Sequence, residues 1–229
     1  MFVQFMLKNV LSFKEETVLD MTAINAYKEH QCNLIDYGTK EKYLRVAAIY
    51  GANASGKSNI YMAMTYFQRI IAESLNNVED GEATAIQTYY QPFSFDSEKE
   101  NSEFQIVQIL GNFEYKYGFE YNSNCIVTEW LYRKNLQTKR SSTVFERTTE
   151  KVEFGSCVRK ECEVYKEQIP VETLVLTFFN KLKLKSNIFK IVYSGVMDTL
   201  VVPTDFCEDT RLLEALLPRL IDEEKSALV

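Results

Sequence analysis

The sequence predicts a mixed α/β (α+β) fold that contains an antiparallel β-meander and a helical C-terminal segment. Three observations lead to this prediction. A short apolar run, 44–50, ends at a glycine and is followed by a segment of helical period. Stretches rich in β-branched and aromatic residues then alternate with asparagine-bearing turns between residues 86 and 154. From Gly155 onward the pattern becomes helical. The length of 229 residues suits one medium-sized domain or two small ones.

The first strands are predicted from local β-forming composition. Residues 2–10 and 17–21 are rich in β-formers and are separated by a short polar break, so we expect two strands at the edge of a sheet. A polar connection, 25–42, follows. The run from Leu44 to Tyr50 is apolar throughout except for Arg45, which is typical of a buried central strand.

A helix is predicted directly after this run. Apolar residues recur at i, i+3, i+4 and i+7 from residue 60 to residue 75, which indicates an amphipathic helix of about five turns. The pair Asn76-Asn77 should end it. The periodic positions are Ile60, Ala63, Met64, Phe67, Ile70, Ile71 and Leu75.

The meander is predicted from three strand-like stretches, 104–110, 115–121 and 126–132, with asparagines at the turns between them. Their aromatic residues favour packing against the sheet, and a base-stacking platform is the alternative. Further along, 171–184 and 210–228 are the best helical candidates.

Composition limits the location and the partners. The formal net charge is -6 and the pI is about 5.1, so any contact with nucleic acid must use a local basic patch. No secretion signal is recognisable from Met1 to Phe13, and no run of about 18 apolar residues predicts a membrane span. We therefore expect a cytoplasmic protein. Five cysteines without a Cys-x-x-Cys pair, together with one histidine, favour reduced thiols over a zinc site.

Residues 51–58 carry the most specific motif in the chain. They match Gly-x-x-x-x-Gly-Lys-Ser/Thr, the phosphate-binding loop (P-loop, Walker A motif) that joins a strand to a helix. Backbone N–H groups at a helix N-terminus bind phosphate, Lys57 should reach the β- and γ-phosphates, and the Ser58 hydroxyl should bind Mg²⁺. The alternative is a glycine-bearing turn with an incidental lysine. The predicted nucleotide-binding residues are Gly51, Ala52, Asn53, Ala54, Ser55, Gly56, Lys57, Ser58 and Asn59.

Hydrolysis would need a second strand that ends in acidic residues. The one formal candidate is Asp222-Glu223, but Pro218 and Arg219 interrupt the apolar strand that such a motif requires. We interpret these two acids as exposed residues at a helix end. No catalytic residue is identified in this sequence.

The chain resembles the N-terminal part of the ABC-type AAA ATPases of the abortive-infection (AbiL/RloA-like) group, which are related to SMC-like and OLD-like ATPase heads. The likeness runs over about the first 150 residues, and its segments are 5–15, 47–59, 91–96, 117–120 and 129–132. It implies ATP with Mg²⁺, an ABC-type P-loop NTPase lobe, ATP hydrolysis, pairing of heads into a homodimer or higher oligomer, and a protein effector in prokaryotic antiviral defence.

The chain departs from that family's pattern toward its C-terminus. It contains no Leu-Ser-x-Gly signature and no switch histidine. The resemblance therefore implies an N-terminal lobe at 1–154, holding the phosphate loop, the first helix and the meander. Residues 155–229 are then a mainly helical segment, the start of an insertion that leads to a missing C-terminal lobe.

Two further features have alternative interpretations. By resemblance, Gln91 corresponds to the glutamine that links Mg²⁺ to the attacking water, and a strand-edge glutamine before Pro92 is the alternative. The basic pairs 133–134 and 139–140 could hold nucleic-acid phosphates, although solvated charges are routine at a hairpin tip. The lysines at 181, 183, 185 and 190 are interpreted as a solvated face.

Three hypotheses for function follow. The first is an ATP-hydrolysing defence ATPase represented by its nucleotide-binding lobe. The second is a nucleotide-gated assembly module with negligible turnover. A P-loop kinase is the third, and it is weaker because the long meander does not resemble a kinase lid.

Overall fold

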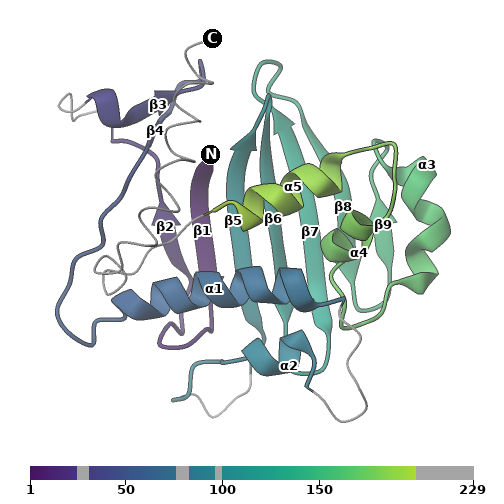
Figure 1. The fold of residues 1–229 in the computed structure, drawn as a ribbon, viewed down its shortest axis with the longest axis horizontal. Helices are drawn as coiled ribbons and strands as arrows, with labels where there is room; N and C mark the ends of the chain where they lie inside the picture. The colour runs from purple at the N-terminus through teal and green to yellow at the C-terminus, as the bar shows by residue number, and fades with distance from the viewer. Residues whose placement is uncertain (25–30, 76–82, 96–99, 200–229) are drawn as a thin grey trace, which may run out of the picture. The chain divides into compact units, whose positions relative to one another are not determined.

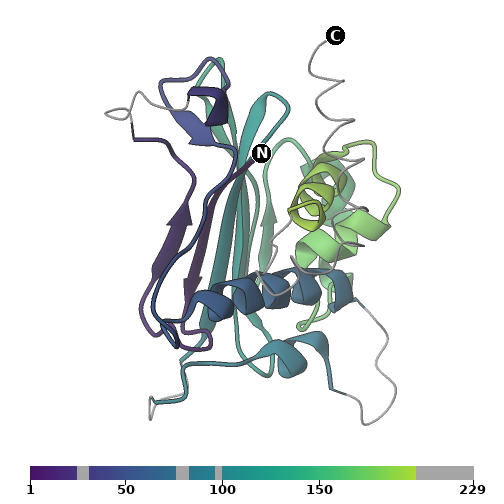
Figure 2. The ribbon, with the colours of Figure 1, turned by 60° about the vertical axis from the view of Figure 1, so that its left-hand side comes forward.

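The computed structural model describes residues 1–24, 31–75, 83–95 and 100–199. Residues 1–199 form one compact unit. In it, a seven-stranded sheet carries helices α1, α4 and α5 on one face, as both views show (Figures 1 and 2). The fold is therefore mixed α/β with an antiparallel sheet.

The large sheet has the strand order β2-β1-β5-β6-β7-β8-β9, and every neighbouring pair is antiparallel. The predicted edge strands and the predicted meander are both confirmed. The bounds are β1 Phe2–Lys8, β2 Thr17–Asp20, β5 Ser102–Leu110, β6 Phe113–Tyr121, β7 Ile126–Asn135, β8 Ser141–Thr148 and β9 Val152–Phe154.

Asparagines form the turns of the meander, as predicted. The Asn135 side-chain oxygen accepts the backbone N–H groups of Gln137 and Thr138 at 3.0 and 2.8 Å. Asn122 accepts those of Asn124 and Cys125 in the same way. Such side-chain acceptors replace a backbone turn bond and fix the register of the hairpins.

The predicted long helix is confirmed as α1, Lys57–Glu73. The predicted helix at 171–184 is shorter than expected and runs as α4, Val175–Lys181. The prediction at 210–228 and the acids Asp222 and Glu223 lie outside the described residues. The other elements are η1 Gln31–Asn33, β3 Leu34–Asp36, β4 Lys42–Leu44, α2 Ala85–Tyr89, α3 Arg159–Cys162, η2 Glu163–Gln168 and α5 Ile188–Met197.

The core between α1 and the sheet is aromatic. The Phe67 ring of α1 packs on Phe5, Phe104 and Phe119, with ring centroids 5.5 to 5.7 Å apart. All four side chains are buried. The meander aromatics Phe104 and Phe119 therefore pack against α1, as the sequence favours. They help to hold in place the helix that begins at the phosphate loop.

The predicted buried strand at 44–50 was wrong. Strand β4 ends at Leu44, and residues 46–50 form no strand and are exposed. Val46 and Tyr50 are 75% and 90% exposed. An apolar run becomes a buried strand only where neighbouring strands and covering elements flank it. The part of the chain that the structure describes supplies none here.

Residues 155–199 belong to the same compact unit as the sheet, and the division at residue 154 stays a prediction. Within the described ranges, no helix combines the length and the apolar character needed to cross a bilayer.

Candidate nucleotide-binding site

The phosphate loop turns sharply just before α1. Gly56, the N-cap of α1, has φ +90° and ψ 5°, and Ala54 has φ +61°. Left-handed residues that alternate with other conformations direct successive N–H groups toward one side, which makes a concave anion site. Gly51 allows a close approach, because a Cβ there would lie 2.7 Å from Ser55 Oγ.

The first turn of α1 presents free donors. Asn59 and Ile60 both donate their N–H groups to the Gly56 carbonyl, at 3.0 and 3.3 Å. The N–H groups of Lys57 and Ser58 have no acceptor in the described ranges, and no side chain caps the helix. These donors lie at the positive end of a 17-residue helix, where anions bind well.

Lys57 and Ser58 have the freedom that their predicted roles require. Lys57 Nζ donates to the Gly51 and Ala52 carbonyls, at 2.8 and 2.7 Å, so its ammonium lies over the loop. Ser58 is exposed, and its hydroxyl makes no hydrogen bond within the described part of the chain. One ammonium and one free hydroxyl beside free amides fit a phosphate chain with a bound Mg²⁺.

Two residues that were not predicted as site residues support the loop. A Cβ on Gly56 would lie 3.3 Å from Ser12 Oγ and 3.5 Å from the Phe13 ring. Asn59 Nδ2 donates to Ser12 Oγ at 2.8 Å. Ser12 is 47 residues away from Asn59, and the only sequence signal for it was the resemblance of segment 5–15.

Gln91 lies next to the same β1–β2 turn. Its backbone carbonyl accepts the Leu11 N–H at 2.7 Å, and the residue is exposed. Its role as a metal ligand stays a prediction. The β1–β2 turn therefore contacts both the Gln91 segment and the phosphate loop.

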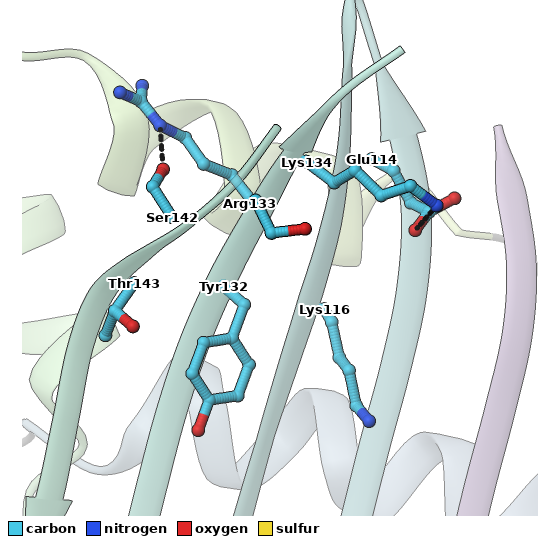
Figure 3. A pocket seen from close by; sticks show the side chains of 8 residues that line it. Glu114, Lys116, Tyr132, Arg133, Lys134, Ser142 and Thr143 are labelled. Carbon is cyan, nitrogen blue, oxygen red and sulfur yellow. Dashed lines mark hydrogen bonds and ion pairs between the residues drawn. The ribbon is translucent and has the colours of Figure 1, made fainter. Parts of the chain in front are cut away.

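Arg133 and Lys134, near the β7–β8 hairpin, make separate contacts (Figure 3). Lys134 pairs with Glu114 at 3.5 Å, whereas Arg133 donates to Ser142 Oγ at 3.2 Å and lies 5.1 Å from the centre of the Phe113 ring. Adjacent strand residues point to opposite faces, so these two cations do not form one patch. A shallow pocket of about 360 Å³ lies there. Nucleic-acid binding stays a prediction.

Comparison with known families places this geometry in context. Residues 46–160 match the family described as "AAA domain, putative AbiEii toxin, Type IV TA system". The match covers 115 of the 229 residues, about half of the chain. The chain belongs to this family. The matched part of this AAA domain starts at Val46 and includes the phosphate loop, α1 and the meander. A search of the curated proteins finds no match.

Membership in this family confirms the general prediction of an AAA-type ATPase. The AAA domain is a nucleotide-binding ATPase module, so the prediction of an AAA-type ATPase with a P-loop lobe holds. This match does not reach the level of the AbiL/RloA-like group, so that assignment stays a prediction.

Proposed function

We propose that this AAA domain binds ATP with Mg²⁺ in the loop Gly51–Ser58. The observation that carries the proposal is the set of free N–H groups at the start of α1, next to the Lys57 ammonium and the Ser58 hydroxyl. A triphosphate is held best by donors that need no rearrangement, and backbone amides at a helix N-terminus are such donors.

Each residue then has a defined part in binding. The loop amides receive phosphate oxygens, and Lys57 exchanges its carbonyl acceptors at Gly51 and Ala52 for the β- and γ-phosphates. Ser58 supplies one oxygen to Mg²⁺, an ion that neutralises phosphate charge when bound. Gly56 lets the backbone come close to the phosphates, because glycine has no Cβ and adopts the left-handed φ of this position without strain.

We propose further that hydrolysis requires a second lobe of ABC type. Val46, Ile49 and Tyr50 form an exposed apolar segment that leads directly into the loop. A strand from another lobe that pairs along this segment would bury these side chains and bring acidic residues to the phosphates. The resemblance to AbiL/RloA-like ATPases supports this arrangement, in which heads form a homodimer or higher oligomer.

The same resemblance supports a role in prokaryotic antiviral defence, in which the nucleotide state controls a protein effector. The matched family is described as a "putative AbiEii toxin, Type IV TA system", which supports a role of this general class and says nothing of a separate effector. In this proposal the ATPase acts as the switch and the effector carries the toxic activity.

A nucleotide-gated assembly module with negligible turnover is the second candidate. One observation favours it: within the described ranges, the side chains that support the loop are Ser12, Phe13 and Asn59, and none of these three is acidic. Steady-state phosphate release separates the two candidates. An ATPase should release phosphate once the C-terminal lobe or a partner is supplied, whereas the module should bind ATP and release almost none.

Calorimetric titration with ATP and Mg²⁺ tests the binding proposal. The Lys57→Ala variant should lose binding, at least about 100-fold, because it lacks the only ammonium in the loop. Its stability should stay within about 0.5 kcal/mol of the wild type, since among the described residues the lysine ammonium bonds only to carbonyls of its own loop. Lys151→Ala, which removes an exposed lysine paired with Glu153, is the matched control and should bind normally. Unchanged affinity in Lys57→Ala would refute the assignment.

A further inference from the structure

The turn between β1 and β2, residues 9–13, contacts both halves of the candidate site. On one side Ser12 Oγ accepts the Asn59 amide at 2.8 Å and lies against Gly56. On the other side the Leu11 N–H donates to the Gln91 carbonyl at 2.7 Å. One short segment therefore contacts both the Gln91 segment and the first turn of α1.

Asn9 anchors this turn from the interior. The residue is 4% exposed, and its side-chain oxygen accepts the Phe93 N–H at 2.9 Å. Its side-chain amide donates to the Glu100 and Asn101 carbonyls, at 2.7 and 3.3 Å. The Asn9 carbonyl accepts Ser102 Oγ at 2.7 Å. All of its polar side-chain atoms are thus used to join the turn, the Phe93 segment and the start of β5.

The turn has a backbone conformation that its surroundings must hold. Asn9 and Leu11 have φ values of +52° and +54°, in the left-handed region. Asparagine tolerates this region, but leucine rarely adopts it. Val10 and Phe13 close the turn with two reciprocal backbone bonds of 2.9 Å. The unfavourable residue, Leu11, is the one whose N–H holds Gln91, which links the conformation of the turn to the position of that residue.

We propose that Asn9 is a positioning residue that, through this turn, places Gln91 and the phosphate loop so that both act on one nucleotide–magnesium complex. The inference rests on the proposed function and on the metal-ligand role of Gln91 that the resemblance implies. Mg²⁺ demands near-octahedral oxygen ligands with little tolerance, so a small displacement of one ligand segment weakens the metal contribution to binding. The phosphate contribution depends on the loop itself, and it does not need Asn9.

This difference gives a readout that a purely structural role would not change. ATP affinity is measured by calorimetry in excess Mg²⁺ and again in EDTA, and the ratio of the two affinities is the magnesium-dependent gain. The first variant is Asn9→Gly, which keeps the left-handed backbone available and removes the side-chain bonds. Gln91→Ala and the double variant complete the set.

The proposal predicts that Asn9→Gly lowers the magnesium-dependent gain by about tenfold, as loss of an outer-shell partner does at metal sites. Affinity in EDTA should stay within about twofold of the wild type, because the loop amides and Lys57 are unchanged. Gln91→Ala should give the same loss, and the double variant should be no worse than either single variant. Ser12→Ala, a surface change that leaves the core intact, should lower the gain in the same direction.

The matched control is Asn135→Gly, which removes an asparagine that accepts two backbone N–H groups at the β7–β8 turn, away from the loop. Its gain should equal that of the wild type. An unchanged gain in both Asn9→Gly and Ser12→Ala, or an equal fall of both affinities in Asn9→Gly, would overturn the positioning role while ATP binding stands. Absence of any wild-type binding would instead refute the proposed function itself.

Discussion

The Glu129 carboxylate and the Arg147 guanidinium lie 4.0 Å apart in the interior, with side chains 0% and 6% exposed. The carboxylate also accepts the backbone N–H groups of Val175 and Leu176, at 2.7 and 3.1 Å, and the Tyr117 hydroxyl at 3.0 Å. A side chain from β7 therefore caps the N-terminus of α4, which has no cap of its own.

This pair also fixes α4 relative to the phosphate-loop helix. Arg147 donates to the carbonyls of Pro170 and Thr173 just before α4. In turn, Thr177 Oγ1 donates to the Ile71 carbonyl at 2.6 Å, and Thr173 Oγ1 donates to the Ser74 carbonyl at 2.9 Å, at the C-terminal end of α1. The buried ion pair thus helps to hold the helix that starts at the phosphate loop.

At pH 8, where Glu129 is a carboxylate, the Glu129→Gln variant should lower the free energy of unfolding by about 2–3 kcal/mol. A carboxylate can accept all of these bonds, whereas an amide has one acceptor oxygen and places an NH₂ group against a buried donor. Urea denaturation measures the change. Glu153→Gln, at an exposed acid paired with Lys151, should leave the urea midpoint of unfolding unchanged. An equal effect of the two variants would contradict the role of the buried pair.

The pH dependence of stability should reveal the same residue. Burial raises the pKa of Glu129 from its ordinary value of 4.5 to about 7, although Arg147 and the hydrogen-bond donors oppose this shift. An acid whose pKa is raised on folding holds its proton more tightly in the folded state. Its favourable contribution is therefore complete below about pH 4.5 and is lost as the pH rises to about 7.

The difference in unfolding free energy between wild type and Glu129→Gln isolates this contribution from the other carboxylates. Measured by urea denaturation at intervals from pH 5 to pH 8, the difference should fall up to about pH 7 and then stay level. A difference that grows with pH would show instead that folding lowers the pKa of Glu129.

Gly56 should be irreplaceable for binding. Alanine there must adopt φ +90° and push against Ser12 and Phe13, so we expect strain of about 1–2 kcal/mol and at least about tenfold weaker ATP binding. Gly111→Ala is the matched control, since it also has a left-handed φ but open space around it. Its free energy of unfolding should fall by about as much as in Gly56→Ala, and its ATP affinity should equal that of the wild type. Equal affinities in the two variants would contradict the loop geometry.

The exposed segment 46–50 should matter for association and not for the fold of the described unit. Replacing Val46 by threonine and Tyr50 by serine should change the unfolding free energy by less than about 0.5 kcal/mol, because both side chains are mostly exposed. Self-association at high concentration, followed by light scattering, should decrease because an exposed apolar run favours contact between molecules. A large loss of stability would show that these side chains are packed.

Local patterns in the sequence were sufficient to predict the edge strands, the meander and α1, because periodicity and turn residues act over short distances, whereas phosphate binding by the loop 51–58 stays a prediction. The strand at 44–50 was not predictable in this way, since burial depends on neighbours that the run itself does not specify. No role was predicted for Glu129 or Arg147, because they lie 18 positions apart in the sequence and only the fold brings them together. The contact of Ser12 with Asn59 is equally non-local, and the roles of Gln91 and Asn59 stay predictions.

A crystal structure with excess Mg²⁺ and a non-hydrolysable ATP analogue tests the central claim most directly. We predict phosphate oxygens at the amides of the loop Gly51–Ser58, the Lys57 ammonium moved from the Gly51 and Ala52 carbonyls to the phosphates, and the Ser58 hydroxyl on the metal. An analogue bound elsewhere, with Lys57 still on those two carbonyls, would contradict it.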